Sequence, residues 1–504
     1  MQLIEKILKE GKTSILLVPE ISLTPQTVNR FIARFGEKEV AVLHSKLSVG
    51  ERYDQWYKIK RGEAKIIVGA RSAIFAPAEN IGIIIIDEEH DSSYKAENTP
   101  AYDAKEIARK IAQDNNIPLV LGSATPDMES YYRAQKEEVG LLKLTKRANN
   151  ASLPEVEVVD LREELANGNK SMISKKLYLE MKENIEKHKQ TILFLNRRGF
   201  STFIMCRNCG YVAKCKNCNI NLTYHANSNS LKCHYCGYER SSLTNCPECG
   251  SSQIRYFGTG TQKLEAEVKK MFPNATTIRM DVDTVNKKNS HEQILQKFQE
   301  ENIDILIGTQ MVVKGHHFPN VTLVGVIAAD GSLNIDDFRA NERTFQLLTQ
   351  VAGRAGRENE KGKVIIQTYN PDNFAIVCSK KQDYDLFYKT EMNIRQSLKY
   401  PPFCDIIMFA ISTSNELELK EVLSKLYHYL KNRLLKEKFG IILYPPVSAP
   451  IDKIKNKFRW RIIVKCKLDN TIIDLISDTQ KEYIKIKTKE TRLNILVNPN
   501  DMAH

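Results

Sequence analysis

The 504-residue sequence lacks any apolar run that approaches the roughly 20 residues of a membrane-spanning helix. Its first residues, from Met1 to Glu5, follow the pattern of an ordinary helix and not that of a signal peptide. We therefore expect a cytoplasmic protein that does not insert into a membrane. Its 42% hydrophobic and 27% charged residues are typical of a globular chain, and its length suits roughly three domains.

Acidic residues are in deficit. The chain has 61 of them against 74 lysines and arginines, which leaves a formal net charge of +13. A surplus of positive charge of this size favours a polyanionic partner such as a nucleic acid, although many basic proteins bind no polyanion.

Cysteines are scarce outside one short segment, because eight of the eleven fall between Cys206 and Cys249. In a cytoplasmic chain such clustering indicates metal binding and not disulfides. The eight form four Cys-x-x-Cys pairs, and two pairs complete a tetrahedral four-sulfur site, so we predict two Zn²⁺ ions. The spacing leaves open which pairs combine. The predicted ligands are Cys206, Cys209, Cys215, Cys218, Cys233, Cys236, Cys246 and Cys249.

The run 83–86 is four isoleucines and predicts a strand that is buried on both faces, because no face is left for water. Asp87, Glu88, Glu89 and His90 follow it. Ligands of open α/β sheets bind outside the carboxyl ends of the strands. Asp87 could there hold the Mg²⁺ of a nucleoside triphosphate, and Glu88 could orient the attacking water. The alternative is a solvated acidic turn after a core strand.

Further strands alternate with helical stretches, which predicts an α/β fold with a mostly parallel sheet. The triplet 11–13, Gly-Lys-Thr, imitates the end of a phosphate-binding loop. However, Lys6 stands where the first glycine of that loop is required. The triplet also precedes a strand, whereas a phosphate loop opens a helix. We therefore reject it as a phosphate site.

One predicted helix carries Glu342, Arg343 and the stretch from Gln350 through Arg357, and it ends in a glycine-rich turn. Arg354 and Arg357 are three residues apart and share one face. This spacing lets both guanidinium groups reach one triphosphate, as arginine fingers do. The alternative is an ion-pair face on the surface.

Three of these stretches resemble motifs II, III and VI of the superfamily 2 helicases, namely 87–90, 123–125 and 350–357. The phrases 17–26 and 68–73, together with the eight-cysteine insertion, resemble more specifically the primosomal protein N′ (PriA) family of replication-restart helicases. The resemblance covers essentially the whole chain. It implies two RecA-like lobes, a two-zinc insertion in the second lobe and a small α+β C-terminal domain.

The resemblance also implies boundaries and an activity. Lobe 1 is expected at residues 1–150, lobe 2 at 151–399 with the insertion at about 203–255, and a C-terminal DNA-binding domain at 400–504. The expected protein is an ATP- and Mg²⁺-dependent 3′–5′ DNA helicase that recognises stalled or abandoned replication forks and initiates primosome assembly. Its expected partners are DNA, primosome proteins and single-strand-binding proteins.

The site residues follow from the matched motifs. Asp87, Glu88, Arg354 and Arg357 are expected to be catalytic, with His90 and Gln350 beside the nucleotide. Ser123 and Thr125 would link the nucleotide to the DNA track, and Tyr94 and Tyr102 match an aromatic loop. Family resemblance favours nested zinc pairing, with the first and last cysteine pairs on one ion. The DNA contacts expected in the lobes are Glu20, Thr24, Gln26, Arg71, Ser72, Thr259, Thr309 and Lys314.

The C-terminal region is expected to bind fork DNA. Between Lys420 and Lys467 the chain has thirteen lysines or arginines against three acids, enough to neutralise several phosphates. Lys453 and Arg459 are the candidate contacts, beside Pro450, Lys455 and Trp460.

Family members carry a glycine-rich phosphate loop and its lysine before the segment that begins at Val18. The present sequence starts inside the helix of that loop, so we expect an N-terminally truncated chain that binds ATP weakly and hydrolyses it at a negligible rate. The alternative function is a zinc-stabilised module that binds fork DNA and docks partners without enzyme activity.

Overall fold

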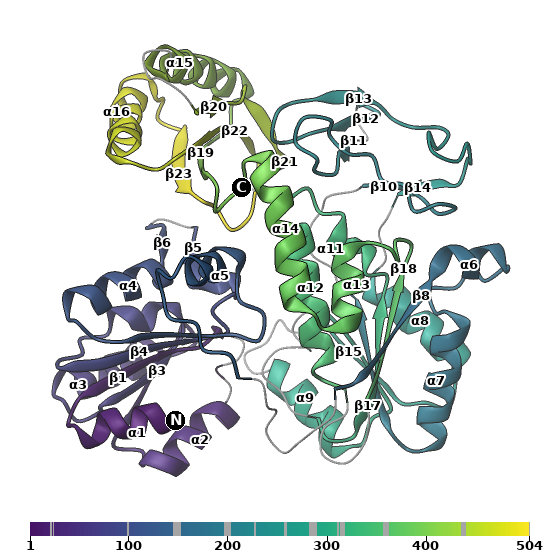
Figure 1. Ribbon diagram of the computed structural model, residues 1–504, viewed down its shortest axis with the longest axis horizontal. Helices are drawn as coiled ribbons and strands as arrows, with labels where there is room; N and C mark the ends of the chain where they lie inside the picture. Colours follow the sequence, from purple (N-terminus) through teal and green to yellow (C-terminus); the bar gives the residue numbers. More distant parts are fainter. Residues whose placement is uncertain are drawn as a thin grey trace. The chain divides into compact units, whose positions relative to one another are not determined.

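The computed structural model describes residues 1–20, 23, 25–97, 100–144, 153–195, 203–225, 228–256, 260–281, 290–309, 312, 318–355, 362–434 and 440–502. It contains two compact units, one formed by Met1–Val139 and the other by most of the chain from Gly140 onward. Figure 1 labels their helices and strands. None of the helices in the described ranges has both the length and the apolar character needed to cross a membrane.

The first unit is built on a parallel five-stranded sheet with the order β2-β3-β1-β4-β7. Strand β4 lies inside the sheet, between β1 and β7. The strands are β1 (Thr13–Leu17), β2 (Val40–Leu43), β3 (Ile66–Gly69), β4 (Ile81–Asp87) and β7 (Leu119–Gly122), and the helices are α1 (Gln2–Lys9), α2 (Pro25–Phe35), α3 (Val49–Lys60), α4 (Ala104–Asp114) and α5 (Met128–Gln135).

Both faces of β4 are covered, as its isoleucine run predicts. Ile84 and Ile86 pack in one apolar cluster with Ala104 and Ala108 of α4. Ile85 packs against the cluster on the opposite face, which includes Phe31 of α2. Because both faces of the sheet are apolar and covered, polar chemistry in this unit is confined to the loops at the strand ends.

The second unit contains a parallel six-stranded sheet with the order β15-β16-β9-β17-β18-β8. Helices α7 and α8 cover one face with an apolar cluster, and Figure 1 shows α12 and α13 on the other side. The strands are β8 (Glu155–Asp160), β9 (Gln190–Leu195), β15 (Thr277–Met280), β16 (Ile305–Gly308), β17 (Val321–Ile327) and β18 (Lys363–Thr368); the helices are α6 (Leu161–Ala166), α7 (Lys175–Glu186), α8 (Thr261–Met271), α9 (Ser290–Glu300), α11 (Asp330–Leu333), α12 (Ala340–Ala352), α13 (Phe374–Lys381) and α14 (Tyr384–Leu398).

The cysteine-rich segment lies between β9 and α8. It is made of short antiparallel pieces: β10 (Ile204–Cys206) pairs with β14 (Ile254–Tyr256), and β11 (Thr223–His225), β12 (Ser230–Lys232) and β13 (Glu239–Ser241) form a small sheet. We call residues 203–256 the zinc module, for the reasons given below.

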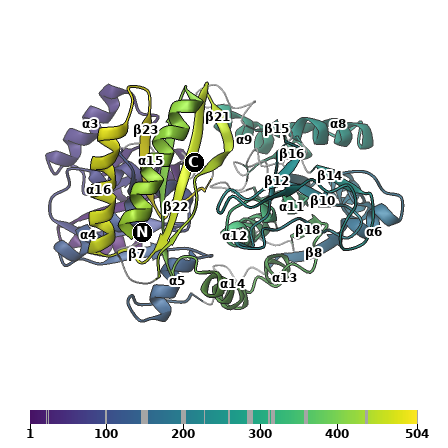
Figure 2. The same ribbon diagram turned by 90° about the horizontal axis from the view of Figure 1, so that it is seen from above.

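The last part of the chain forms an antiparallel sheet with helices α15 and α16 on one face (Figure 2). Alternate residues of β19 face opposite sides: Ile407 and Phe409 pack with the helices, whereas Ile406 and Met408 pack in a cluster that includes Leu231 of the zinc module. The elements are β19 (Asp405–Thr413), α15 (Glu416–Leu434), β20 (Ile442–Leu443), β21 (Val447–Ile454), β22 (Lys457–Cys466), α16 (Asn470–Ile486) and β23 (Arg492–Val497). The expected α+β character of this region is confirmed.

Candidate nucleotide and zinc sites

Asp87 is the last residue of β4 and lies at the carboxyl edge of the sheet in the first unit. The backbone N–H of Glu88 donates to Asp87 Oδ1 at 3.0 Å, and Glu88 has a φ of 47° in the left-handed region. The hydroxyl of Tyr94 lies 2.6 Å from the carbonyl oxygen of Asp87 and 3.1 Å from that of Leu17 at the end of β1. One hydroxyl thus bonds to backbone carbonyls at the ends of both β1 and β4, next to the Asp87 carboxylate.

Water reaches the Asp87 side chain, but the protein around it limits solvation and raises the pKa of its carboxyl group. In the first unit, an exposed carboxylate at the carboxyl end of an interior parallel strand is well placed to bind a hard cation such as Mg²⁺. The donor chemistry therefore fits the metal that the sequence predicts here.

His90 connects this site to the next strand end. Its Nδ1 lies 2.7 Å from Ser123 Oγ, and the same hydroxyl accepts a hydrogen bond from the N–H of Thr125 at 3.0 Å. His90 Nδ1 also lies 3.6 Å from Glu88 Oε2. The structure therefore brings five sequence-predicted residues together, from the loops after β4 and β7.

Glu89 has a structural role that the sequence analysis did not assign. Its side chain is buried, and its carboxylate accepts hydrogen bonds from Asp127 N at 2.8 Å, Ser130 Oγ at 3.0 Å and Lys105 Nζ at 3.2 Å. Lys105 also contacts the Asp127 carboxylate, which caps α5. Burial and the nearby Asp127 raise the pKa of Glu89 to about 7.

This cluster holds the acidic loop against α4 and α5. Two carboxylates share one buried ammonium group, and they hold the pKa of Lys105 well above its usual range despite its burial. The sequence signal that could have located it is Asp127, an N-cap residue directly after Pro126.

The eight clustered cysteines form two groups of four sulfur atoms. One group joins Cys206 and Cys209 to Cys246 and Cys249, and the other joins Cys215 and Cys218 to Cys233 and Cys236. Within each group all Sγ atoms lie within 4.8 Å of one another. We call these groups the outer site and the inner site, respectively; together they have the nested pairing.

The sulfur spacing fits zinc. Sγ–Sγ distances are 3.7 Å for Cys206–Cys249, 3.5 Å for Cys209–Cys246 and 3.5 Å for Cys215–Cys236. Four thiolates at about 2.3 Å from a zinc ion would be separated by about 3.8 Å. Both groups are four-sulfur zinc sites with no open position, so their role is structural.

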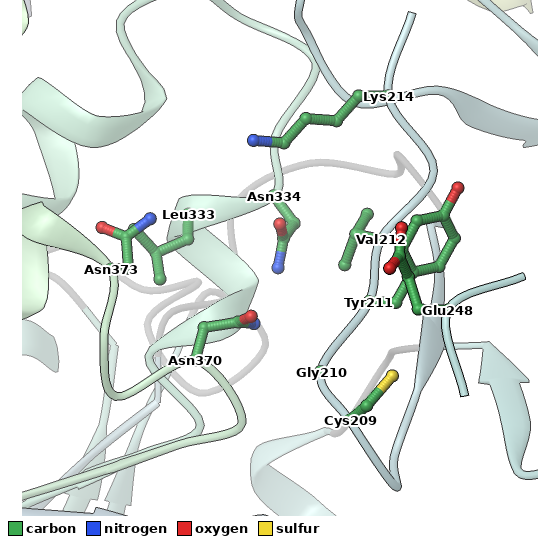
Figure 3. A pocket seen from close by; sticks show the side chains of 10 residues that line it. All are labelled: Cys209, Gly210, Tyr211, Val212, Lys214, Glu248, Leu333, Asn334, Asn370 and Asn373. Atoms are coloured by element: carbon green, nitrogen blue, oxygen red, sulfur yellow. The ribbon is translucent and has the colours of Figure 1, made fainter. Parts of the chain in front are cut away.

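Three glycines allow the tight turns of these sites. Gly210, Gly237 and Gly250 directly follow a cysteine pair and have φ values of 78°, 75° and 71°. Gly210 also makes a close approach, because a Cβ atom there would lie 2.3 Å from the carbonyl oxygen of Tyr369, in the loop after β18. The backbone of the zinc module at Gly210 therefore packs closely against the backbone of the loop that follows β18 (Figure 3).

Family models match the chain in four places. They describe a DEAD/DEAH box helicase (residues 1–134), the PriA DNA helicase Cys-rich region (215–240), a helicase conserved C-terminal domain (249–359) and a primosomal protein N C-terminal domain (396–500). The replication restart protein PriA of Haemophilus influenzae is 39% identical over 504 residues, which cover 100% of this chain and 68% of that protein.

The chain belongs to the PriA family. The PriA of Bacillus subtilis is 51% identical over 99% of this chain, and that of Synechocystis sp. is 44% identical over 91% of it. The chain spans 62% and 56% of the length of these two PriA proteins. The RecG structure bound to a three-way DNA junction has 13% identity and a TM-score of 0.43, over 76% of this chain and 40% of that one, and adds no weight to the assignment.

The PriA resemblance assigns several residues of the first unit to a DNA track. Glu20, Gln26 and Ser72 are exposed, and Glu20 accepts a hydrogen bond from Ser45 Oγ. Arg71 is already engaged: its Nη1 donates to the carbonyl oxygens of Ser93 at 3.0 Å and Lys95 at 2.8 Å. Thr24 lies outside the described residues.

The two tyrosines of the expected aromatic loop differ. Tyr94 is only 1% exposed, because its ring belongs to the core below β4. Tyr102 is half-buried, with its ring 5.4 Å from the Arg71 guanidinium group and 5.1 Å from the ring of Phe75. Tyr94 thus has a structural role, because its hydroxyl bonds to the backbone carbonyl of Asp87. Of the two tyrosines, Tyr102 is the one whose side chain water reaches.

The structure describes only some of the residues that the PriA motifs predict in the second unit. Thr309 follows β16 and is largely buried. The helix predicted to run through Arg357 ends earlier: α12 stops at Ala352, so Gln350 lies in its last turn and Arg354 lies beyond it, both half-buried. Thr259, Lys314 and Arg357 lie outside the described residues.

The C-terminal candidates lie on the hairpin formed by β21 and β22. Lys455 and Asn456 at its turn have φ values of 48° and 63°. Lys453 is exposed with its ammonium group 4.5 Å from the Phe458 ring, and Arg459 is half-buried with Nη1 3.4 Å from the carbonyl oxygen of Ile451. Burial lowers the pKa of Arg459.

Proposed function

We propose that this chain carries the helicase lobes, the zinc module and the C-terminal DNA-binding domain of an ATP-dependent 3′–5′ DNA helicase. Its proposed task is to recognise stalled or abandoned replication forks and to initiate primosome assembly in the cytoplasm. Its proposed partners are fork DNA, primosome proteins and single-strand-binding proteins. The observation that carries the proposal is the exposed Asp87 carboxylate at the end of an interior parallel strand, joined to the next strand end through His90 and Ser123.

The roles of the residues follow from their positions. Asp87 would hold Mg²⁺, which neutralises phosphate charge, and Glu88 would orient the attacking water. The contact between His90 and Ser123 would couple this site to the loop of Thr125. Gln350, Arg354 and Arg357 are proposed to contact the nucleotide, with the two arginines as arginine fingers. The remaining assignments are proposed DNA contacts: Glu20, Thr24, Gln26, Arg71, Ser72, Thr259, Thr309, Lys314, Lys453 and Arg459.

We assign lobe 1 to residues 1–150, lobe 2 to 151–399 with the zinc insertion at about 203–255, and the C-terminal domain to 400–504. The contact clusters support a C-terminal unit with its own helices, since α15 and α16 cover one face of its sheet.

One observation favours the alternative function. The 504 residues contain no Gly-x-x-x-x-Gly-Lys-Ser/Thr stretch, so the chain by itself lacks the loop that holds the β- and γ-phosphates. A module that binds fork DNA and docks partners without hydrolysing ATP is therefore the second candidate function for these 504 residues.

Parallel measurements on the 504-residue chain distinguish these functions. Fluorescence anisotropy with a labelled fork and an ATPase assay with and without single-stranded DNA would be run on one preparation. Fork binding with DNA-stimulated hydrolysis supports the helicase, and fork binding without hydrolysis supports the binding module. Absence of fork binding would contradict both.

A further inference from the structure

Helix α3 of the first unit turns an apolar face to solvent. Val49 is 89% exposed, Tyr53 59% and Trp56 37%, and Tyr57 beside them is half-buried. Positions 49, 53, 56 and 57 follow the i, i+4, i+7, i+8 spacing of one helix face. We call these four residues the aromatic stripe. None of them belongs to the two apolar clusters that cover the faces of β4.

The inward face of α3 is largely polar, because it closes the free edge of a strand. Strand β2 is the outermost strand of the five-stranded sheet. Gln55 Oε1 accepts a hydrogen bond from the N–H of Val42 at 3.0 Å, and Lys58 Nζ donates to the carbonyl oxygen of Val40 at 2.9 Å. The buried apolar residue of the helix is Ile59. Helix α3 therefore packs through hydrogen bonds to a strand edge, and its aromatic side chains are not needed for the core.

The rings of the aromatic stripe pack on one another and on cations. The ring centroids of Tyr53 and Tyr57 are 4.3 Å apart, and those of Trp56 and Tyr57 are 5.5 Å apart in an edge arrangement. Lys60 Nζ lies 5.2 Å from the centre of the Trp56 ring. The Arg61 guanidinium group lies 5.7 Å from the centre of the Tyr57 ring. A contiguous apolar surface rimmed by charge is typical of protein interaction sites.

Three cations border the aromatic stripe. Lys60 lies on the same helix face, four residues after Trp56, and Arg52 and Arg61 flank that face on its two sides. Within the described residues neither Arg52 nor Lys60 forms an ion pair. Arg61 has a contact of 3.7 Å with the exposed Glu63. Carboxylates brought to these cations would form charge-assisted hydrogen bonds.

Acidic groups are fewer beside the stripe. Glu51 is held in the N-terminal cap of α3, where its carboxylate accepts a hydrogen bond from the N–H of Ser48 at 2.7 Å. Asp54 is exposed on the other flank of the helix. The balance of charge around the apolar surface is therefore positive, which complements an acidic partner.

The size of the stripe suits a short segment of a partner. Helix α3 has 12 residues and is thus about 18 Å long. A stable interface between two copies of a protein takes roughly 20 to 30 residues from each, more than one helix face supplies. A single-stranded nucleic acid fits less well, because the rings already pack on one another and the Asp54 carboxylate repels phosphate.

We propose that the aromatic stripe of α3 binds an acidic amphipathic helix of a partner protein. Apolar side chains of that helix would lie between the rings of Tyr53, Trp56 and Tyr57, as the ridges of one helix pack into the grooves of another. Its carboxylates would pair with the three cations that border the stripe. This surface is independent of the nucleotide site and of the DNA contacts proposed above, so the two proposals can fail separately.

Peptide display on the purified 504-residue chain tests the proposal. The probe is a library of helical peptides with leucines at every third or fourth position and random residues elsewhere. The peptides are about 18 residues long, above the length at which isolated helices are marginal. We expect the selected peptides to be enriched in aspartate and glutamate at the random positions. Absence of enrichment, or enrichment of lysine and arginine, would overturn the proposal.

A matched pair of aromatic variants locates the contact. Binding of the most enriched peptide is followed by fluorescence anisotropy of a label on the peptide. Tyr53→Ser should weaken this binding at least about fivefold, as the loss of an interface anchor does. Phe75→Ser is the control, because Phe75 is 56% exposed in the same unit but lies outside the stripe, and its loss should leave the affinity unchanged. Equal affinities for the unmodified chain and Tyr53→Ser would overturn the assignment of the surface.

A second pair tests the role of charge. Lys60→Glu should weaken binding of the acidic peptide several-fold, because a carboxylate then faces the carboxylates of the peptide. Lys110→Glu makes the same change of net charge at an exposed lysine of α4 and should have little effect. Equal losses would show general electrostatic attraction to the chain and no specific docking at α3.

Two measurements distinguish the other occupants. The chain has two tryptophans, so Trp460→Phe leaves Trp56 as the one indole reporter. The acidic peptide should shift the emission of Trp56 and an oligothymidylate should not; the reverse result would make the stripe a nucleic-acid surface. Self-association of the unmodified chain in sedimentation experiments that Tyr53→Ser abolishes would show that a second copy covers the stripe. Thermal unfolding of each variant confirms that the fold is retained.

Discussion

Arg461 donates two hydrogen bonds to the carbonyl oxygen of His234, the residue directly after the zinc ligand Cys233. The distances are 2.7 Å from Nη2 and 3.2 Å from Nε, and the arginine is fully buried. The Tyr400 hydroxyl makes a similar contact, 3.1 Å from the carbonyl oxygen of Cys218. The C-terminal sheet is thus anchored on backbone groups of the inner site.

Arg461→Gln should destabilise the chain by about 2 to 4 kcal/mol, because it leaves a buried carbonyl with a weaker donor and removes a buried charge that faces Asp336. Chemical denaturation followed by tryptophan fluorescence would measure the loss. Arg433→Gln is the control: Arg433 Nη2 lies 3.3 Å from Asp478 Oδ2 in a surface pair, and its loss should cost less than about 1 kcal/mol. Equal effects would contradict the anchoring role.

Loss of the inner and the outer zinc ion should have different consequences. Cys233→Ser and Cys249→Ser each remove one ligand, from the inner and the outer site respectively. Hydrogen exchange should accelerate in β22, residues 457–466, for Cys233→Ser, since Arg461 loses an ordered acceptor. In Cys249→Ser the same amides should stay protected. Zinc content measured on both proteins confirms the loss, and equal exchange in β22 would show that the anchor does not depend on the inner site.

Gly210→Ala should weaken the packing of the zinc module against the loop that follows β18. The new Cβ would lie 2.3 Å from the Tyr369 carbonyl oxygen, in addition to the strain of a left-handed φ. Gly250→Ala has the same φ strain but no atom within 4 Å of the new Cβ. We expect a loss of about 2 to 4 kcal/mol for the first and about 1 kcal/mol for the second. Thermal unfolding with zinc content monitored provides the comparison.

The buried Glu89 should make stability depend on pH. Its pKa rises on folding from 4.5 to about 7, so between these values the folded chain binds more protons than the unfolded chain. The contribution of Glu89 to the free energy of unfolding therefore falls as the pH rises from about 4.5 to 7, by about 1 to 3 kcal/mol.

Glu89→Gln should remove this contribution while keeping much of the hydrogen bonding to Asp127 and Ser130. Unfolding free energies between pH 5 and 8 should then depend less on pH for Glu89→Gln than for the unmodified chain. A variant with an unchanged pH profile would show that Lys105 keeps the Glu89 carboxylate ionised throughout.

A chimera tests the proposed helicase activity. A strand, a Gly-x-x-x-x-Gly-Lys-Thr loop and the start of its helix are fused in front of Met1. We expect ATP hydrolysis stimulated by single-stranded DNA, and a loss of at least about 100-fold when Asp87→Asn removes the Mg²⁺-binding carboxylate. Asp91→Asn, four residues on, is the control, because Asp91 caps a short turn through Ser93 N at 2.9 Å. Normal hydrolysis by the Asp87→Asn chimera would contradict the role given to Asp87.

The sequence by itself was sufficient for features whose determinants are local. Four Cys-x-x-Cys pairs identify the metal ligands because a hairpin of four residues already aims its two thiolates at one point. The isoleucine run 83–86 identifies a doubly covered strand, and Asp87 falls at its carboxyl end because the apolar run stops there.

Other features depend on residues that are far apart in the chain and were decided by the tertiary structure. Glu89 is indistinguishable from its acidic neighbours in the sequence, and only the packing of Asp127, 38 residues away, removes it from solvent. Tyr94 resembles a loop aromatic until its ring is seen below β4. Arg461 belongs to a basic stretch that predicts DNA contact, yet it is buried against His234, 227 positions earlier. Burial decides the role of such charged and aromatic side chains, and burial is a property of distant contacts that local sequence does not contain.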